Sequence, residues 1–381
     1  YYDNPEIKPI VRVVSYSFLI YALNSVHLAI LYKNLEVKIT RLSSIIGSSV
    51  TGVVGILLAY NGFGVWSLVL SGLTGSIVSA IIIWKASTWR PKLLFSFSDI
   101  KLLMPFGFRV FIVNYLDQIY SRVDVLIIGK IFNPAVLGQY YRASSFNQLV
   151  TKYTSQGLSG VFFPVISKLQ DNIEQIKNVF NKSLHVICFL SFFLTGFLYI
   201  NAEPLIVLLF SSKWMPAVHY FKILAFSSYV YPMTIVFNGT LLGTGNSSNQ
   251  LRLELIKKGI GVGGLGIGFL FGLNGYLWSL AITAFIGLVF SLVFIGKAIG
   301  GSITHYFGLI YSYSIPLLFA AGAALLLSRH LSDNLWIQLC FNSFTYILIY
   351  LIVNHLTNMP GYLSVKKIIL ELFLKYTKRV D

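Results

Sequence analysis

Arg12-Val-Val-Ser-Tyr-Ser-Phe-Leu-Ile-Tyr21 and Lys222-Ile-Leu-Ala-Phe-Ser-Ser-Tyr-Val-Tyr231 have the same residue pattern, about 210 positions apart. A second pair follows at nearly the same distance, since Gly64-Val-Trp-Ser-Leu68 returns as Gly275-Tyr-Leu-Trp-Ser-Leu280 with one residue inserted. Each copy runs through three apolar segments separated by short polar turns. Weak similarity between two halves of an apolar chain is typical of membrane transporters built from two lobes.

The repeat also predicts what surrounds each copy. Further apolar segments between Asp99 and Phe210 precede the second copy, whereas only eleven residues precede the first. We therefore expect the first lobe to be incomplete, with its start roughly 110 residues before Tyr1. An even number of expected spans separates the copies, so both lobes should have the same orientation in the membrane.

The composition predicts a polytopic, all-α membrane protein. Apolar residues make up 56% of the chain and charged residues 11%, which excludes an ordinary soluble domain. Windows of about 18 to 25 apolar residues recur, each long enough to cross a hydrocarbon core of roughly 30 Å. We expect about eleven transmembrane helices. Their expected spans are residues 9–31, 42–60, 63–84, 100–131, 135–165, 180–211, 216–243, 253–273, 275–299, 303–328 and 334–356.

The net charge of +16 is distributed unevenly over the connections between these spans. Alternate connections carry most of the cations, and by the positive-inside rule they lie in the cytoplasm together with the C-terminal tail. We assign Arg252, Lys257 and Lys258 to one of these cytoplasmic loops. The other members of the set are Lys33, Lys38, Arg41, Lys85, Arg90, Lys92, Lys101, Lys168, Lys177, Lys182, Lys297, Lys366, Lys367, Lys375, Lys378 and Arg379.

Two of the expected spans carry polar stripes. The first stripe has helical spacing and is acidic, and the second keeps the same spacing and is basic. Ionised groups at bilayer depth cost at least about 2.5 to 3.5 kcal/mol each, so they should face a bundle interior and be paired. The first stripe comprises Asn114, Asp117, Ser121 and Asp124, flanked by Arg109 and Arg122, and the second comprises Arg142, Ser145, Lys152 and Gln156.

The stripes have two interpretations. In the first, Asp117 and Asp124 only neutralise Arg122, Arg142 or Lys152 and hold the helices in register. In the second, the cations bind a phosphate or an acidic sugar, and the carboxylates bind a proton or Na⁺ that couples transport to the membrane potential.

The sequence contains no pattern that indicates catalysis. We find no Ser-His-Asp, paired-carboxylate or Cys/His spacing, and both cysteines, Cys188 and Cys340, fall in apolar runs. We therefore expect a protein that is not an enzyme and that needs neither a cofactor nor a metal ion.

Short motifs occur along the chain in a recognisable order. They are Tyr2-Asp-Asn-Pro-Glu6, the run from Arg12 to Phe18, the run from Leu58 to Leu68, Arg90-Pro91, the run from Arg122 to Gly129, the run from Leu137 to Ala143, and Phe163-Pro-Val-Ile-Ser167. In these motifs the chain resembles the Wzx-type polysaccharide-biosynthesis flippases, a branch of the superfamily that also includes multidrug exporters and the peptidoglycan-precursor flippase. The last two spans match by hydropathy alone.

The resemblance implies about fourteen helices, in two six-helix lobes around a central cavity with two accessory helices. The expected domains are then residues 1–90, with three helices of the first lobe, residues 91–300, with the second lobe, and residues 301–381, with the accessory helices and a basic cytoplasmic tail.

The activity that the resemblance implies is movement of an undecaprenyl-diphosphate-linked oligosaccharide across the bacterial inner membrane, by alternating access, for O-antigen, capsule or exopolysaccharide synthesis. A glycan needs a polar cavity to cross, and a diphosphate needs cations. The candidate partners are this lipid-linked oligosaccharide, membrane lipids, H⁺ or Na⁺ as coupling ion, and polysaccharide polymerase machinery, with no nucleic acid. The candidate substrate-binding residues are Arg122, Arg142, Lys152, Asn114 and Gln156, and the candidate cation-coupling residues are Asp117 and Asp124.

Two alternatives stay open. A cation-coupled multidrug exporter would have the same fold and would change drug susceptibility without altering a surface glycan. A membrane glycan polymerase is more remote, because such an enzyme needs a sizeable outward loop with catalytic residues, and the longest internal connections here are about 15 residues.

Overall fold

A computed structural model of the chain describes residues 7–92, 96–132, 134–155, 158, 160–328 and 334–377. Within these residues every regular element is a helix and no strand occurs. The chain divides into two compact units, Tyr1–Phe97 and Ser98–Asp381. The prediction of an all-α fold is confirmed.

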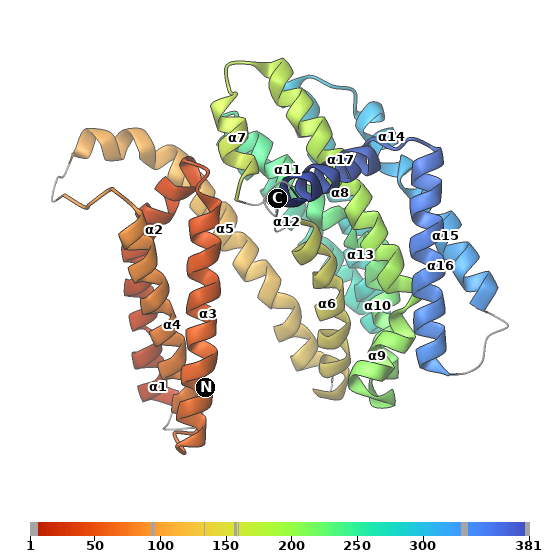
Figure 1. Cartoon of the computed structure of the whole chain (residues 1–381), viewed down its shortest axis with the longest axis horizontal. Coiled ribbons are helices and arrows are strands. Elements are labelled where there is room, and N and C mark those ends of the chain that lie inside the picture. The colour runs from red at the N-terminus through yellow and green to blue at the C-terminus, as the bar shows by residue number, and fades with distance from the viewer. Residues whose placement is uncertain are drawn as a thin grey trace. The chain divides into compact units, whose positions relative to one another are not determined.

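The first unit contains α1 (Ile7–Val14), α2 (Tyr16–Lys33), α3 (Val37–Tyr60) and α4 (Val65–Ala86). Helices α2, α3 and α4 lie side by side, as Figure 1 shows in red and orange. Helices α3 and α4 approach most closely at Gly47 and Gly75, where a Cβ atom on either glycine would collide with the facing helix. These glycines therefore allow backbone-to-backbone packing, as small residues do between membrane helices.

The second unit is a larger bundle whose described helices begin with the long α5. Helix α5 leads into α6, and α8 runs through the middle of the bundle, where it contacts α6, α10, α11, α15, α16 and α17. The helices are α5 (Phe97–Ile131), α6 (Pro134–Ser155), α7 (Phe162–Lys168), α8 (Ile173–Ile200), α9 (Ala202–Phe210), the short η1 (Ser212–Trp214), α10 (Met215–Ser228), α11 (Val230–Gly243), α12 (Ser247–Leu270), α13 (Gly272–Ile299), α14 (Ile303–Ser312), α15 (Ser314–Ser328), α16 (Leu335–Leu356) and α17 (Pro360–Thr377).

Five of the expected spans are each divided between two described helices, and a proline accounts for three of these breaks. Those three fall at Asn201, Tyr229 and Tyr313, each three positions before Pro204, Pro232 or Pro316. Proline lacks an N–H group, and its ring clashes with the carbonyl oxygen four residues earlier, so it favours a break in that turn, although α5 continues past Pro105. The expected spans 180–211, 216–243 and 303–328 are therefore each divided between two helices.

The sequence repeat is also a structural repeat. Helices α3 and α12 each have 24 residues, and they begin and end at positions that correspond in the sequence repeat. Helix α2 ends in a left-handed residue, Leu35 with φ 62°, and α11 ends in the equivalent Gly245 with φ 76°. In both turns the next backbone N–H bonds back to the helix, from Glu36 to Leu31 and from Asn246 to Leu241. This is the same helix-ending motif in both copies.

The C-terminal helices pack against α8 within the second unit. Tyr346 and Tyr350 of α16 are fully buried, and their hydroxyl groups donate to carbonyl oxygens of α8 at 2.9 Å (Phe193) and 2.8 Å (Phe189). A buried tyrosine hydroxyl needs such a partner, because no water reaches it. These two bonds therefore join α16 to the middle of the bundle.

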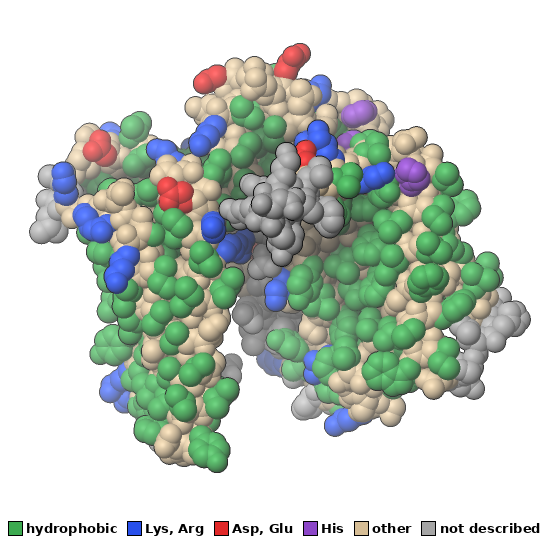
Figure 2. Space-filling model, viewed as in Figure 1, with side chains coloured by type: hydrophobic (Ala, Val, Ile, Leu, Met, Phe, Trp, Pro, Cys, Tyr) green, Lys and Arg blue, Asp and Glu red, His purple; other side chains and the backbone are tan. Residues whose placement is uncertain are grey.

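In its described residues, each of the eleven expected spans holds one helix or two successive helices. Eight spans are long and apolar enough to cross a membrane by length and composition. The helices in the other three, α5, α6 and α12, carry more charged and polar residues. On the face drawn in Figure 2, hydrophobic side chains cover the middle of the helices in each unit, and most charged side chains lie toward helix ends. This distribution fits a polytopic membrane protein.

Candidate functional site

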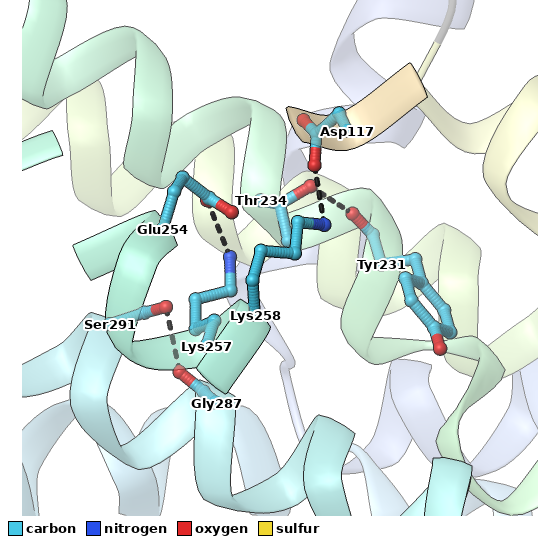
Figure 3. A network of polar contacts seen from close by, with 8 residues as sticks. All are labelled: Asp117, Tyr231, Thr234, Glu254, Lys257, Lys258, Gly287 and Ser291. Carbon is cyan, nitrogen blue, oxygen red and sulfur yellow. Dashed lines mark hydrogen bonds and ion pairs between the residues drawn. The ribbon is translucent and has the colours of Figure 1, made fainter. Parts of the chain in front are cut away.

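A cavity of about 260 Å³ lies within the second unit, between α11, α12 and α13, with one residue of α5 at its wall. Four acidic or basic side chains among the described residues line it: Asp117 of α5, and Glu254, Lys257 and Lys258 of α12. Figure 3 shows these four side chains together with their hydroxyl-bearing neighbours. The cavity is thus a polar site inside a bundle of apolar helices.

The four charges form two ion pairs. Lys258 Nζ lies 2.5 Å from Asp117 Oδ1, and Lys257 Nζ lies 2.7 Å from Glu254 Oε1. The two lysines and two carboxylates balance, so the set has no net charge when all four are ionised. Pairing of this kind is what ionised groups require at membrane depth.

The spacing along α12 places three of these residues on one helix face. Glu254, Lys257 and Lys258 stand at positions i, i+3 and i+4, and Gly261 continues the face at i+7. On the facing helix α13, Gly287 leaves room for a side chain. A Cβ atom there would lie 3.5 Å from Lys257 Cγ, so the stem of Lys257 runs along the surface of α13.

Burial increases from the α5 side of the cavity toward α12. The exposed fraction of the side chain is 43% for Asp117, 23% for Lys258, 19% for Lys257 and 4% for Glu254. Glu254 is therefore the deepest charge, and its single close cation is held by the turn of its own helix. Asp117 is the most accessible, and its pairing with Lys258 joins two different helices.

A second contact joins the same two helices. Arg109 Nη1 donates to Ser247 Oγ at 3.4 Å, two turns before Asp117 on α5 and three turns before Lys258 on α12. Because both contacts advance along both helices, α5 and α12 run in the same direction. Long side chains, rather than backbone approach, make these two connections.

The hydroxyl groups of the cavity bond to their own helices. Ser291 donates to the Gly287 carbonyl at 2.8 Å, and Thr234 donates to the Tyr231 carbonyl at 2.6 Å. Each hydroxyl oxygen keeps its lone pairs, so it can still accept a hydrogen bond from a ligand.

The residues predicted from the two polar stripes do not all lie in this cavity. Asp117 lies in the cavity, and the ion pair that it forms among the described side chains is with Lys258 of α12. Asn114 is exposed on α5. Arg122 and Asp124 lie in the helical part of α5, but their side chains are outside the described residues, as is Gln156.

The two remaining candidates on α6 do not line this cavity. The guanidinium of Arg142 lies over the Phe210 ring at 3.9 Å and over the Trp214 ring at 4.9 Å. Such stacking satisfies part of a cation's need for partners away from water. Lys152 is exposed and lies 5.7 Å from the centroid of the Tyr153 ring.

Three residues of the cavity are not predicted from the sequence. Lys257 and Lys258 are expected in a cytoplasmic loop and Glu254 has no expected role, whereas all three lie inside α12. The repeat could have identified them, because the equivalent positions on α3 are Ser44, Gly47 and Ser48. A change from small residues to charges at one helix face, between two otherwise similar copies, is a signal of a local function.

No metal site was found in the part of the chain that the structure describes. No group of three or more His, Cys, Asp or Glu residues there is placed to hold a metal ion. Cys188 is buried and Cys340 is exposed, and neither takes part in a disulfide.

Comparison with known proteins gives the same fold and places the chain in a family. The solved structure of the lipid II flippase MurJ, in an inward closed conformation, superposes with a TM-score of 0.68 over 91% of this chain and 74% of that one, at 18% sequence identity. The succinoglycan biosynthesis transport protein ExoT of Rhizobium meliloti is 23% identical over 282 residues, which are 74% of this chain and 57% of the relative. The lipopolysaccharide biosynthesis protein WzxC of Escherichia coli is 22% identical over 218 residues, which are 56% of this chain and 44% of the relative.

This chain therefore spans about half the length of these curated relatives. The polysaccharide biosynthesis protein family has a model that matches residues 1–219, more than half of the chain. The chain, with its helical membrane fold, belongs to the polysaccharide biosynthesis protein family.

Proposed function

We propose that the protein moves an undecaprenyl-diphosphate-linked oligosaccharide from the inner to the outer leaflet of the bacterial inner membrane, by alternating access and without covalent chemistry. Membership of the family and the likeness of its fold to that of a lipid flippase support this proposal. The C-terminal tail would lie in the cytoplasm, by the distribution of cations over the loops. A polysaccharide polymerase would be the natural partner.

One observation carries the proposal: four charged side chains line a single cavity among apolar helices. A lipid-linked oligosaccharide combines hydroxyl groups, which need a polar passage, with a diphosphate, which needs cations. Lys257 and Lys258 supply cations inside this polar cavity, where a diphosphate could bind them. A soluble enzyme site or an apolar drug pocket would not need two ion pairs at this depth.

The geometry suggests how the site would respond to its ligand. An entering diphosphate or acidic sugar competes with Asp117 for Lys258, and a proton or Na⁺ on Asp117 releases Lys258 for that anion. Because Asp117 and Lys258 belong to different helices, this exchange breaks a contact between α5 and α12. The ligand and the coupling ion would thus both act on the ion pair that joins α5 to α12.

The other candidates keep their proposed roles. Arg122, Arg142, Lys152, Asn114 and Gln156 remain candidates for contacts with the substrate as it passes, and Asp124 remains a candidate for ion coupling. The stacking of Arg142 between two aromatic rings supports a fixed position for its charge.

The proposal is tested in the bacterium, with the complete gene at its own locus. Lys258→Gln removes a cavity cation, and Lys297→Gln removes an exposed cation that does not line the cavity. We expect Lys258→Gln, and also Arg142→Ala, to accumulate the lipid-linked repeat unit on the cytoplasmic leaflet and to reduce surface polysaccharide, while Lys297→Gln behaves as the wild type.

Normal surface polysaccharide in the Lys258→Gln strain, at wild-type protein level, would refute the role of the cavity. A changed drug susceptibility with an unaltered surface glycan on deletion would favour the multidrug exporter. Polymerisation of supplied precursor by purified protein would favour the polymerase.

A further inference from the structure

A second polar cavity, of about 480 Å³, lies within the first unit between α2, α3 and α4. It is the counterpart of the cavity in the second unit, because both are lined from equivalent positions of the repeat. Tyr21 corresponds to Tyr231, Ser48 to Lys258, and Ser79 to Ser291. Each of the two units therefore contains an equivalent cavity.

The chemistry of the two hollows differs. Glu254, Lys257 and Lys258 in the second unit are replaced by Ser44, Gly47 and Ser48 in the first. Among the residues that line the first cavity no carboxylate occurs, and one cation, Arg41, is present with an interaction of its own. Two serines and a glycine thus stand where the other copy has charges.

Most of these hydroxyl groups already donate a hydrogen bond to a backbone carbonyl oxygen. Ser43 donates to the Thr40 carbonyl at 2.8 Å, Thr51 to the Gly47 carbonyl at 3.0 Å, and Ser76 to the Gly72 carbonyl at 2.9 Å. Ser79 donates to the Ser43 carbonyl of the neighbouring helix at 3.0 Å. A hydroxyl that donates to its backbone offers only its lone pairs to a ligand, so the wall of the cavity is rich in acceptors.

A buried amide points to a ligand independently of this wall. Asn24 lines the cavity and is 5% exposed, and its Oδ1 atom accepts no hydrogen bond from the described residues. A buried acceptor without a partner costs about 1 to 3 kcal/mol. Asn24 Oδ1 therefore lacks a donor among the described residues, and an occupant that brings one would recover this cost.

We propose that the cavity of the first unit binds neutral sugar units of the oligosaccharide, while the charged cavity of the second unit binds its anionic part. This inference rests on the proposed function. Sugar hydroxyls are donors, they are numerous, and they carry no charge, which matches a wall of acceptors without carboxylates. A volume of about 480 Å³ falls within the range of small-molecule sites and exceeds what a bare ion needs.

Binding by purified protein tests the proposal. The full chain is held in an amphipathic polymer, without sugar-based detergent, and is titrated with maltotriose, cellotriose and mannotriose, with inorganic pyrophosphate and with Na⁺. Ser48→Leu places a bulky apolar group on the cavity wall, and Ser49→Leu makes the same change on the same helix at an exposed position that does not line the cavity. Asn24→Leu removes the unpaired acceptor.

We expect at least one neutral trisaccharide to bind, and Ser48→Leu and Asn24→Leu to weaken it about tenfold or more. Ser49→Leu should leave sugar binding unchanged. Pyrophosphate binding should survive in all three variants, which shows that the second unit is intact, and thiol labelling of a Ser71→Cys reporter should stay slow in all three, which shows that the first unit is folded. Absence of binding by every trisaccharide, unchanged affinity in Ser48→Leu, or binding of Na⁺ that Ser48→Leu abolishes would overturn the proposal.

The outcome is separable from that of the proposed function. Lys258→Gln should weaken pyrophosphate and leave the trisaccharide bound. A strain with Lys258→Gln and normal surface polysaccharide would refute the flippase role of the charged cavity, whereas the trisaccharide titrations decide the sugar site by themselves.

Discussion

Alanine at one glycine of the repeat should separate two helices, and alanine at its counterpart should not. Gly75 on α4 and Gly287 on α13 are equivalent positions. A Cβ atom on Gly75 would lie 2.6 Å from the backbone carbonyl oxygen of Gly47, whereas a Cβ atom on Gly287 would meet nothing closer than Lys257 Cγ at 3.5 Å. The first contact is with backbone and cannot be relieved by a rotamer, and the second is ordinary van der Waals contact.

The magnitudes follow from these distances. A carbon and a carbonyl oxygen approach to about 3.3 to 3.6 Å, so α3 and α4 must move apart by about 0.7 to 1 Å in Gly75→Ala. Overpacking of this kind costs about 1 to 3 kcal/mol. Alanine also gains about 0.5 to 1 kcal/mol over glycine within a helix. We therefore expect Gly287→Ala to be neutral or slightly stabilising, and Gly75→Ala to be about 1 to 3 kcal/mol less stable than Gly287→Ala.

Thiol labelling of a buried reporter in each unit measures the two effects separately. Ser71→Cys on α4 and Ser291→Cys on α13 report opening, since both serines are 2% exposed, in a background with Cys340→Ser to remove the exposed native thiol. Each 1.4 kcal/mol changes an opening equilibrium about tenfold. Gly75→Ala should thus accelerate labelling in the first unit by roughly ten- to a hundredfold relative to the effect of Gly287→Ala in the second. If the two alanine substitutions changed the labelling rate of their reporters by the same factor, α3 and α4 would not approach through their backbones at Gly75.

Three further predictions concern single residues. Leu35→Gly should stabilise the end of α2, and Gly245→Leu should destabilise the equivalent end of α11 by about 1 to 2 kcal/mol, because both positions have positive φ. The temperature of thermal unfolding should therefore rise in the first variant and fall in the second. Shifts in the same direction would contradict the shared helix-ending motif. Asp117→Asn should lower the stability of the protein by about 1 kcal/mol, since the ion pair with Lys258 is partly exposed. Adding Lys258→Gln should recover part of this loss in the same thermal unfolding assay, and additive losses would exclude the ion pair. Tyr350→Phe should cost about 0.5 to 1.5 kcal/mol by removing the hydroxyl that donates to α8, seen as faster hydrogen exchange in α16, and unchanged exchange would argue against that bond.

Local signals in the sequence predicted most of the helices. Apolar windows located eleven spans that are helical in their described residues, since the period of an α-helix and the cost of exposing apolar groups act over neighbouring residues, but α17 lies outside these spans. Three of the helix breaks also agree with the positions of Pro204, Pro232 and Pro316, because a proline ring clashes with the carbonyl oxygen four residues earlier. A proline alone does not determine a break, since α5 continues past Pro105.

The candidate site was predicted only in part. Asp117 was identified from its stripe on α5, but its partner was not, because ion pairing depends on which helix lies opposite. Lys257 and Lys258 were assigned to a loop, since charges are more frequent in loops than at membrane depth. The hydroxyl-lined cavity of the first unit gave no charge signal at all, and serine or threonine in a membrane helix normally only bonds back to its own backbone.

By itself the sequence determined a helical membrane protein with an internal repeat, because hydropathy and period are properties of consecutive residues. Only the tertiary structure decided that the repeat forms two equivalent cavities, one charged and one lined by hydroxyl groups. The physical reason is that a cavity is made by side chains of several helices, far apart in the chain. Which groups meet there, and whether each finds a partner, is settled by packing across space and not by the order of residues.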